Sequence, residues 1–167
     1  MVARYPNNMT NYTDYEQKLF AIVKEHGWQL TYVFDPEGIA PDFGYSVGFS
    51  ESIAAPEFII FGLPRDFVSS MLWEVYRQII AGAVPVDGMR WHGLLEGFDC
   101  ISRKAVREDL FAEYVVSAQW FWQETGRSGN PEVFQIVWPG AQQGLFPWEQ
   151  GCDQSVIAAQ PPLWLAK

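Results

Sequence analysis

Residues 41–82 read PDFGYSVGFSESIAAPEFIIFGLPRDFVSSMLWEVYRQIIAG, and this stretch decides the fold. Between residues 43 and 49, large side chains alternate with glycine or serine, which predicts a strand with one bulky face and one nearly bare face. We expect another element to pack closely over the bare face. The unbroken apolar run at 58–61 predicts a central strand that is buried on both sides. Pro64 suits the first position of a helix, so a helix should follow and end at Gly82.

The rest of the chain adds elements on both sides of this stretch. Thr13 and Glu16 match a capping box, which predicts the start of a helix. Short connections favour antiparallel neighbours, so strands at 28–34, 43–49 and 57–63 should form a meander. The other expected elements are a helix over 13–26, one or two strands within 90–103, a helix over 106–125 and a strand over 133–138.

These elements predict a single α+β domain over residues 1–167. Its sheet should be antiparallel or mixed, with about five strands and with about three helices packed mainly on one face. Residues 1–12 are polar and rich in turn formers, and we expect them to be a loose N-terminal lead-in. Residues 139–167 are proline-rich and have no helical period, so we expect a long irregular tail wrapped over the domain.

Composition and charge exclude several classes of function. The chain carries 20 acidic and 11 basic residues and a net charge of −9, which disfavours binding to nucleic acid phosphates. Its apolar runs are far shorter than the roughly 20 residues that span a membrane, and no export signal is evident, so we expect a cytoplasmic protein. Cys100 and Cys152 should then be reduced thiols. The sequence offers no paired metal ligands and no phosphate-binding loop, so no metal and no cofactor is expected.

Several motifs occur in an order that resembles a known family. They are GYSVGF at 44–49, APEFIIFGLP at 55–64, QIVWPG at 135–140, GLFPWE at 144–149 and QPPL at 160–163. This order resembles the bacterial family known as domain of unknown function 4262, and the resemblance runs from about residue 27 to residue 163. It implies a compact soluble α+β domain and brings no established activity.

The first of two candidate functions is a non-catalytic protein-binding module of the immunity or accessory type. Such a module would hold another protein, a peptide or a second copy of the chain through an aromatic and acidic surface. Trp73 and Trp120 fall outside the core faces of their helices, so each is either exposed or covered by the tail. The candidate residues for binding a ligand or partner are Tyr45, Glu57, Trp120, Trp138, Trp148 and Glu149.

The second candidate is a small hydrolase or peptide-modifying enzyme with its site in a cleft under the C-terminal tail. Glu57, Glu149 or His92 would act as acid or base. Trp138 or Trp148 would hold the substrate. This function requires a closed pocket with at least two convergent ionisable groups, and the sequence assigns no residue a catalytic role.

Overall fold

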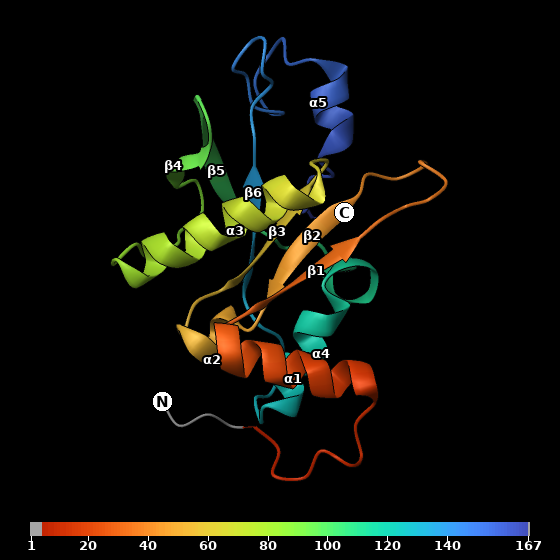
Figure 1. The fold of residues 1–167 in the computed structure, drawn as a ribbon. Coiled ribbons are helices and arrows are strands. Elements are labelled where there is room, and N and C mark those ends of the chain that lie inside the picture. Colours follow the sequence, from red (N-terminus) through yellow and green to blue (C-terminus); the bar gives the residue numbers. More distant parts are fainter. Residues whose placement is uncertain (1–4, 167) are drawn as a thin grey trace.

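The computed structural model describes residues 5–166, which form a six-stranded sheet with helices around it (Figure 1). The elements in chain order are α1 (Asp14–His26), β1 (Gln29–Val33), β2 (Phe43–Val47), α2 (Phe49–Ser52), β3 (Glu57–Phe61), α3 (Arg65–Ile80), β4 (Arg90–Leu95), β5 (Phe98–Lys104), the π-helix η1 (Leu110–Tyr114), α4 (Val116–Glu124), β6 (Val133–Val137) and α5 (Gln154–Ala159). The strand order is β1-β2-β3-β6-β5-β4. β3 and β6 run parallel, and the other neighbouring strands run antiparallel. The sheet is therefore mixed.

The predicted meander and the first helix are confirmed. Tyr45 of β2 lies opposite Thr31 of β1 and opposite Ile59 of β3, both in antiparallel register. The hydroxyl of Thr13 accepts a hydrogen bond from the backbone N–H of Glu16 at 3.2 Å, and the Glu16 carboxylate accepts one from the Thr13 N–H at 2.9 Å. Two N–H groups at the start of α1 are thus satisfied by local side chains, as the sequence pattern indicates.

The bare face of β2 is covered by α3, as expected. A Cβ atom on Gly44 would lie 2.8 Å from a methyl carbon of Val68 in α3 and 3.1 Å from side-chain atoms of Leu30 and Tyr32. Gly44 is needed because the helix approaches the strand this closely.

The prediction that the helices lie mainly on one face of the sheet is wrong. On one face, Tyr45, Ile59 and Phe61 belong to a core that includes residues of α1, η1 and α4. On the other face, Phe58 and Ile60 belong to a core that includes residues of α3. β3 is paired on both edges and is apolar at four successive positions, so both of its faces have to be covered.

Other expectations are corrected in detail. The sheet has six strands because residues 90–104 form two, β4 and β5, that meet at a tight turn. The helix expected over 106–125 is divided at Val115, whose φ of −93° and ψ of 50° are not helical, into η1 and α4. Gly48, with φ of 114°, ends β2 early and begins α2. The tail is not wholly irregular, since it contains α5.

The N-terminal segment packs against Trp120. The Trp120 ring lies 6.0 Å from the ring of Tyr12 and 5.4 Å from that of Phe20, measured between centroids. Tyr5 also contacts Phe20, with centroids 6.0 Å apart. The described part of the expected lead-in, residues 5–12, is therefore packed against α1 and α4. Residues 1–4 of that lead-in lie outside the described range.

Candidate functional site

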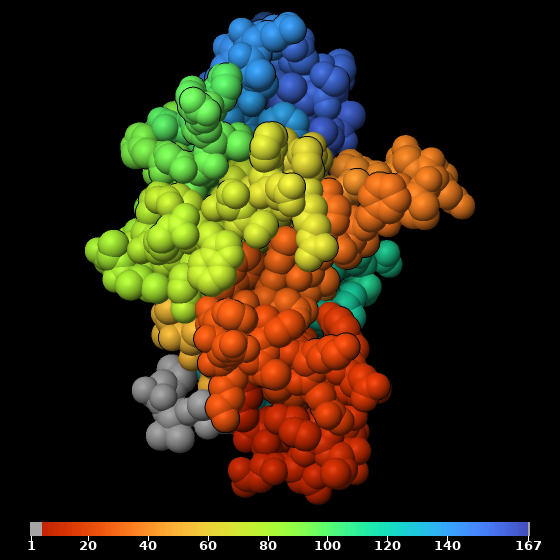
Figure 2. All heavy atoms as spheres, in the orientation of Figure 1, coloured from red at the N-terminus to blue at the C-terminus, as the bar shows by residue number. Residues whose placement is uncertain are grey.

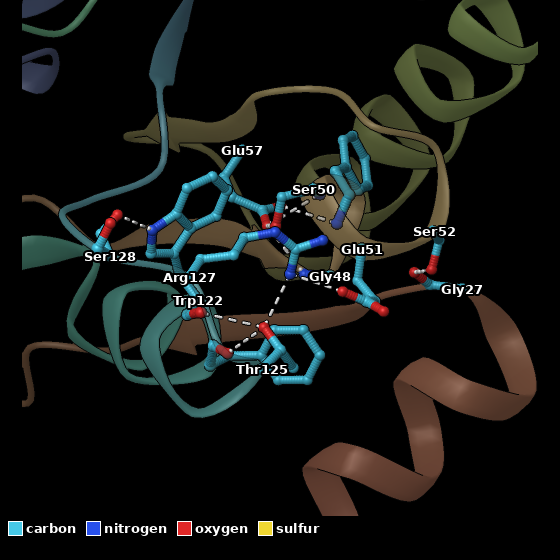
Figure 3. Close-up of polar contacts among 12 residues, drawn as sticks. Gly27, Gly48, Ser50, Glu51, Ser52, Glu57, Trp122, Thr125, Arg127 and Ser128 are labelled. Carbon is cyan, nitrogen blue, oxygen red and sulfur yellow. Dashed lines mark hydrogen bonds and ion pairs between the residues drawn. The ribbon is translucent and has the colours of Figure 1, made fainter. Parts of the chain in front are cut away.

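Glu57 occupies a fully buried polar site at the start of β3 (Figure 3). Its Oε1 accepts hydrogen bonds from the Ser46 hydroxyl at 2.9 Å and from the Phe49 backbone N–H at 3.0 Å. Its Oε2 accepts from the Gly48 N–H at 3.0 Å and from the Ser50 hydroxyl and N–H at 3.2 and 3.4 Å. Burial raises the pKa of the Glu57 carboxyl, and these hydrogen bonds partly oppose the rise. Glu57 thereby ties β3 to the turn between β2 and α2.

A buried ion pair lies beside this carboxyl group. Arg127 Nη1 is 2.6 Å from Glu51 Oε2, and the two side chains are 10% and 4% exposed. The same guanidinium donates to the Thr125 hydroxyl at 2.8 Å and lies over the Trp122 ring at 5.1 Å from its centroid. The pair joins α2 to the segment after α4 (Figure 3). The sequence analysis did not single out Arg127, because its partner comes from a distant part of the chain.

A second region of interest lies at the C-terminal ends of the two central parallel strands, β3 and β6. The Trp138 indole N–H donates to the Phe61 carbonyl at 2.8 Å, which joins the two strand ends. The backbone N–H of Trp138 donates to the Gln160 side chain at 3.0 Å, and that side chain donates to the Trp138 carbonyl at 2.9 Å. Gly62 has φ of 75°, and a Cβ there would lie 2.8 Å from the Ala159 carbonyl oxygen. Trp138 is therefore held rigidly by β3 and by the end of α5.

An apolar groove of about 410 Å³ opens beside Trp138, between the first half of α3 and the β4–β5 hairpin. Glu96 is the one ionisable side chain among the described residues that line it. Phe67 stands at the groove and is 55% exposed. The lining residues are Leu63, Phe67, Ser70, Leu94, Leu95, Glu96, Phe98, Trp138, Pro139 and Ala141.

Comparison with known proteins places the chain in a family. The sequence model of the family described as Domain of unknown function (DUF4262) matches residues 22–153. The chain belongs to this family. The matched range includes Glu57, Arg127 and the groove beside Trp138. A search of curated proteins and a search of solved structures each returned no match.

Three aromatic residues that the sequence analysis discussed, Tyr45, Trp120 and Trp73, pack against other parts of this DUF4262 domain. Tyr45 is 2% exposed, and its hydroxyl accepts a hydrogen bond at 3.1 Å from the backbone N–H of Ser117 in the first turn of α4. Trp120 is half-buried by the N-terminal contacts described above. Trp73 is half-buried too, and its ring lies 5.1 Å from that of Trp28. Their contacts are mainly with the domain itself.

Trp148 and Glu149 are both exposed at the surface of the C-terminal tail. The Trp148 ring stacks on Phe146 at 5.1 Å with an interplanar angle of 4°, and the Arg103 guanidinium lies 5.0 Å from its centroid. Glu149 accepts a hydrogen bond from the Phe146 backbone N–H at 2.7 Å and so closes a turn. His92 is elsewhere, on β4, with Nδ1 2.8 Å from Asp99 and with its side chain 76% exposed. Glu57, Glu149 and His92 thus each have different hydrogen-bond partners.

Within residues 5–166, no helix combines the length and the apolar character needed to cross a membrane. Over the same residues, no group of three or more His, Cys, Asp or Glu side chains is placed to hold a metal ion. Cys100 and Cys152 are both free and buried. Burial raises the pKa of the Cys100 thiol to about 12.

Proposed function

We propose that this DUF4262 protein is a non-catalytic protein-binding module of the immunity or accessory type. It holds a segment of another protein in the apolar groove between α3 and the β4–β5 hairpin. The observation that carries this proposal is the groove itself, because a concave apolar surface with an exposed aromatic at its rim is typical of sites that take an apolar anchor from a partner.

The rigidity of one wall supports this role. The indole of Trp138 is fixed by its hydrogen bond to Phe61, and the Trp138 backbone is bonded on both its N–H and its carbonyl to Gln160. A wall that is already ordered loses little conformational entropy when a partner binds. The groove therefore binds an apolar side chain more favourably than a mobile surface of the same area does.

The placement of the ionisable groups supports a non-catalytic role. The Glu57 carboxyl group accepts five hydrogen bonds from β2 and from the turn around α2, and the Glu149 carboxylate closes a turn in the tail. His92 pairs with Asp99 on an exposed strand. General acid–base catalysis needs such groups to lie within hydrogen-bond reach of one bound substrate, and here each one stabilises its own local structure.

A selection of peptides from a random display library tests the proposal. We expect the selected peptides to share a large aliphatic or aromatic side chain, and we expect Phe67→Ala to weaken their binding by about tenfold. Tyr15→Ala is the matched control, because Tyr15 is an aromatic residue of similar exposure, 52% against 55%, on a different helix. Peptides that share no apolar residue, or that bind the Phe67→Ala variant as tightly as the wild type, would refute the groove as the binding site.

A further inference from the structure

A second hollow adjoins the apolar groove, and the two meet at Leu63. This hollow has a volume of about 870 Å³ and lies between the β1–β2 loop and α5. Leu63 lines both spaces. Figure 2 shows this side of the molecule, with the yellow start of α3 between the green β4–β5 hairpin, the orange β1–β2 loop and the blue C-terminal residues. An extended segment that leaves the groove across Leu63 therefore enters the hollow.

The side chains that line the hollow and carry a charge at neutral pH are all acidic. Among the described residues these are Asp35, Glu37 and Asp42, and no lysine or arginine lines it. The Asp35 carboxylate accepts backbone hydrogen bonds within its own loop, chiefly from Ala40 at 2.7 Å, and these lower its pKa. Asp42 in turn accepts from the Asp35 backbone N–H at 2.8 Å. The negative charge of this loop is thus held in place before any partner arrives.

Apolar surface is exposed beside these carboxylates. Phe34 is 66% exposed and Ile39 is 81% exposed, and both line the hollow. The groove adds one further carboxylate, that of Glu96, so the two spaces together carry acidic groups and no basic ones. A partner that fits this surface combines apolar side chains with positive charge, because like charges would be repelled and unpaired charges would lose hydration.

We infer that the segment held by this surface is an extended peptide in which a large apolar side chain is followed or preceded by lysine or arginine. The apolar side chain enters the groove beside Trp138, and the basic residues lie over the hollow near Glu37 and Asp42. This inference rests on the proposed function and adds the chemistry of the partner. A second copy of the chain fits less well, because each copy carries a net charge of −9.

Three synthetic peptides of about nine residues, long enough to cross both spaces in an extended form, test the inference. They share a central Phe-Leu pair and carry flanks of lysine, serine or glutamate. Binding is measured by fluorescence anisotropy with the full chain. We expect the lysine peptide to bind about threefold more tightly than the serine peptide and about tenfold more tightly than the glutamate peptide, and we expect high salt to remove the difference.

Charge-removing variants locate the effect. The double variant Glu37→Gln, Asp42→Asn should reduce the affinity advantage of the lysine peptide over the serine peptide by at least half. Its asparagine side chain still offers an oxygen to the Asp35 N–H, so the loop keeps this hydrogen bond. Glu25→Gln is the control, since it removes one of the same charges from a side chain on α1 that is 75% exposed.

The outcomes separate the inference from the proposed function. Equal affinities for the three peptides, or a lysine advantage that the double variant keeps in full, would overturn the inference and leave binding in the groove intact. Failure of all three peptides to bind the wild-type protein would overturn both. Self-association that Phe67→Ala abolishes and that the peptides cannot displace would identify the occupant of the groove as a second copy and would also overturn the inference.

Discussion

The substitution Glu57→Gln tests whether the buried carboxyl group holds the turn between β2 and β3 together. The two side chains have nearly the same shape, so the change mainly replaces an acceptor atom by an NH₂ donor. If the amide nitrogen takes the place of Oε1, the Phe49 N–H loses its acceptor; if it takes the place of Oε2, the N–H groups of Gly48 and Ser50 do. At least one buried N–H then faces an NH₂ group, which has no lone pair to accept with, whereas both oxygens of the carboxyl group can still accept when it is protonated.

The number of N–H groups that lose their acceptor sets the size of the destabilisation. A buried donor left without an acceptor costs about 1–3 kcal/mol, so we expect the free energy of unfolding to fall by about this amount. Urea-induced unfolding followed by tryptophan fluorescence measures it. Glu37→Gln is the control, because it makes the same chemical change at an exposed position and should shift the free energy of unfolding by less than about 0.5 kcal/mol.

The difference in unfolding free energy between the wild type and the Glu57→Gln variant should also depend on pH. Burial raises the pKa of Glu57 in the folded state, so the folded protein holds this proton more tightly than the unfolded chain does. The Glu57 contribution to stability is therefore complete below the ordinary pKa of a glutamate and is lost as pH rises through the folded-state pKa. The glutamine variant has no such group, so the difference in unfolding free energy between the two proteins should narrow as the pH is raised above the ordinary pKa of a glutamate.

Two results would contradict this reasoning. If the unfolding free energies of the wild type and Glu57→Gln differ by less than about 0.5 kcal/mol near pH 5, the turn rearranges to satisfy its donors without the carboxyl group. A difference that widens with rising pH would mean that the five donated hydrogen bonds outweigh burial and stabilise the ionised carboxylate.

Three further predictions concern the core. Tyr45→Phe removes the acceptor of the Ser117 N–H and should lower the free energy of unfolding by about 1 kcal/mol in urea, and an unchanged midpoint would contradict this. Gly44→Ala brings a methyl group to 2.8 Å from the Val68 side chain and should cost about 1–3 kcal/mol in the same assay; a stabilised variant would show that α3 moves away freely. Cys100, with a pKa of about 12, should react with a thiol reagent only after unfolding, and rapid labelling of this cysteine in the native protein would contradict its burial.

Much of the fold could be predicted from local patterns. The capping box at Thr13, the alternation along β2 and the proline at the start of α3 each depend on residues close in sequence, and each led to the right element. The predictions that were wrong depend on distant contacts. α5 has six residues, too few to show a helical period, and its end is held by hydrogen bonds between Gln160 and Trp138. The break at Val115 has no proline or glycine to mark it.

The candidate site was less predictable than the fold. Trp138 was selected as a binding residue from its sequence context, and it lines the groove. The helical period places Phe67 on the same apolar arc as the buried residues Met71 and Val75, yet more than half of Phe67 is exposed. Periodicity places a residue on one face of a helix, but it does not say how far the neighbouring hairpin extends over that face.

The sequence by itself determined the α+β class, the antiparallel meander and the family, because these depend on periodicity, turn residues and motif order along the chain. Only the tertiary structure decided that Glu57 is enclosed by the α2 turn, that Arg127 meets Glu51, and that the ends of two parallel strands border an apolar groove and an acidic hollow. The physical reason is that burial and charge pairing are properties of neighbours in space. Neither helical nor strand periodicity brings Glu57 to the turn around Gly48, and Glu51 and Arg127 come from segments that are far apart in the sequence.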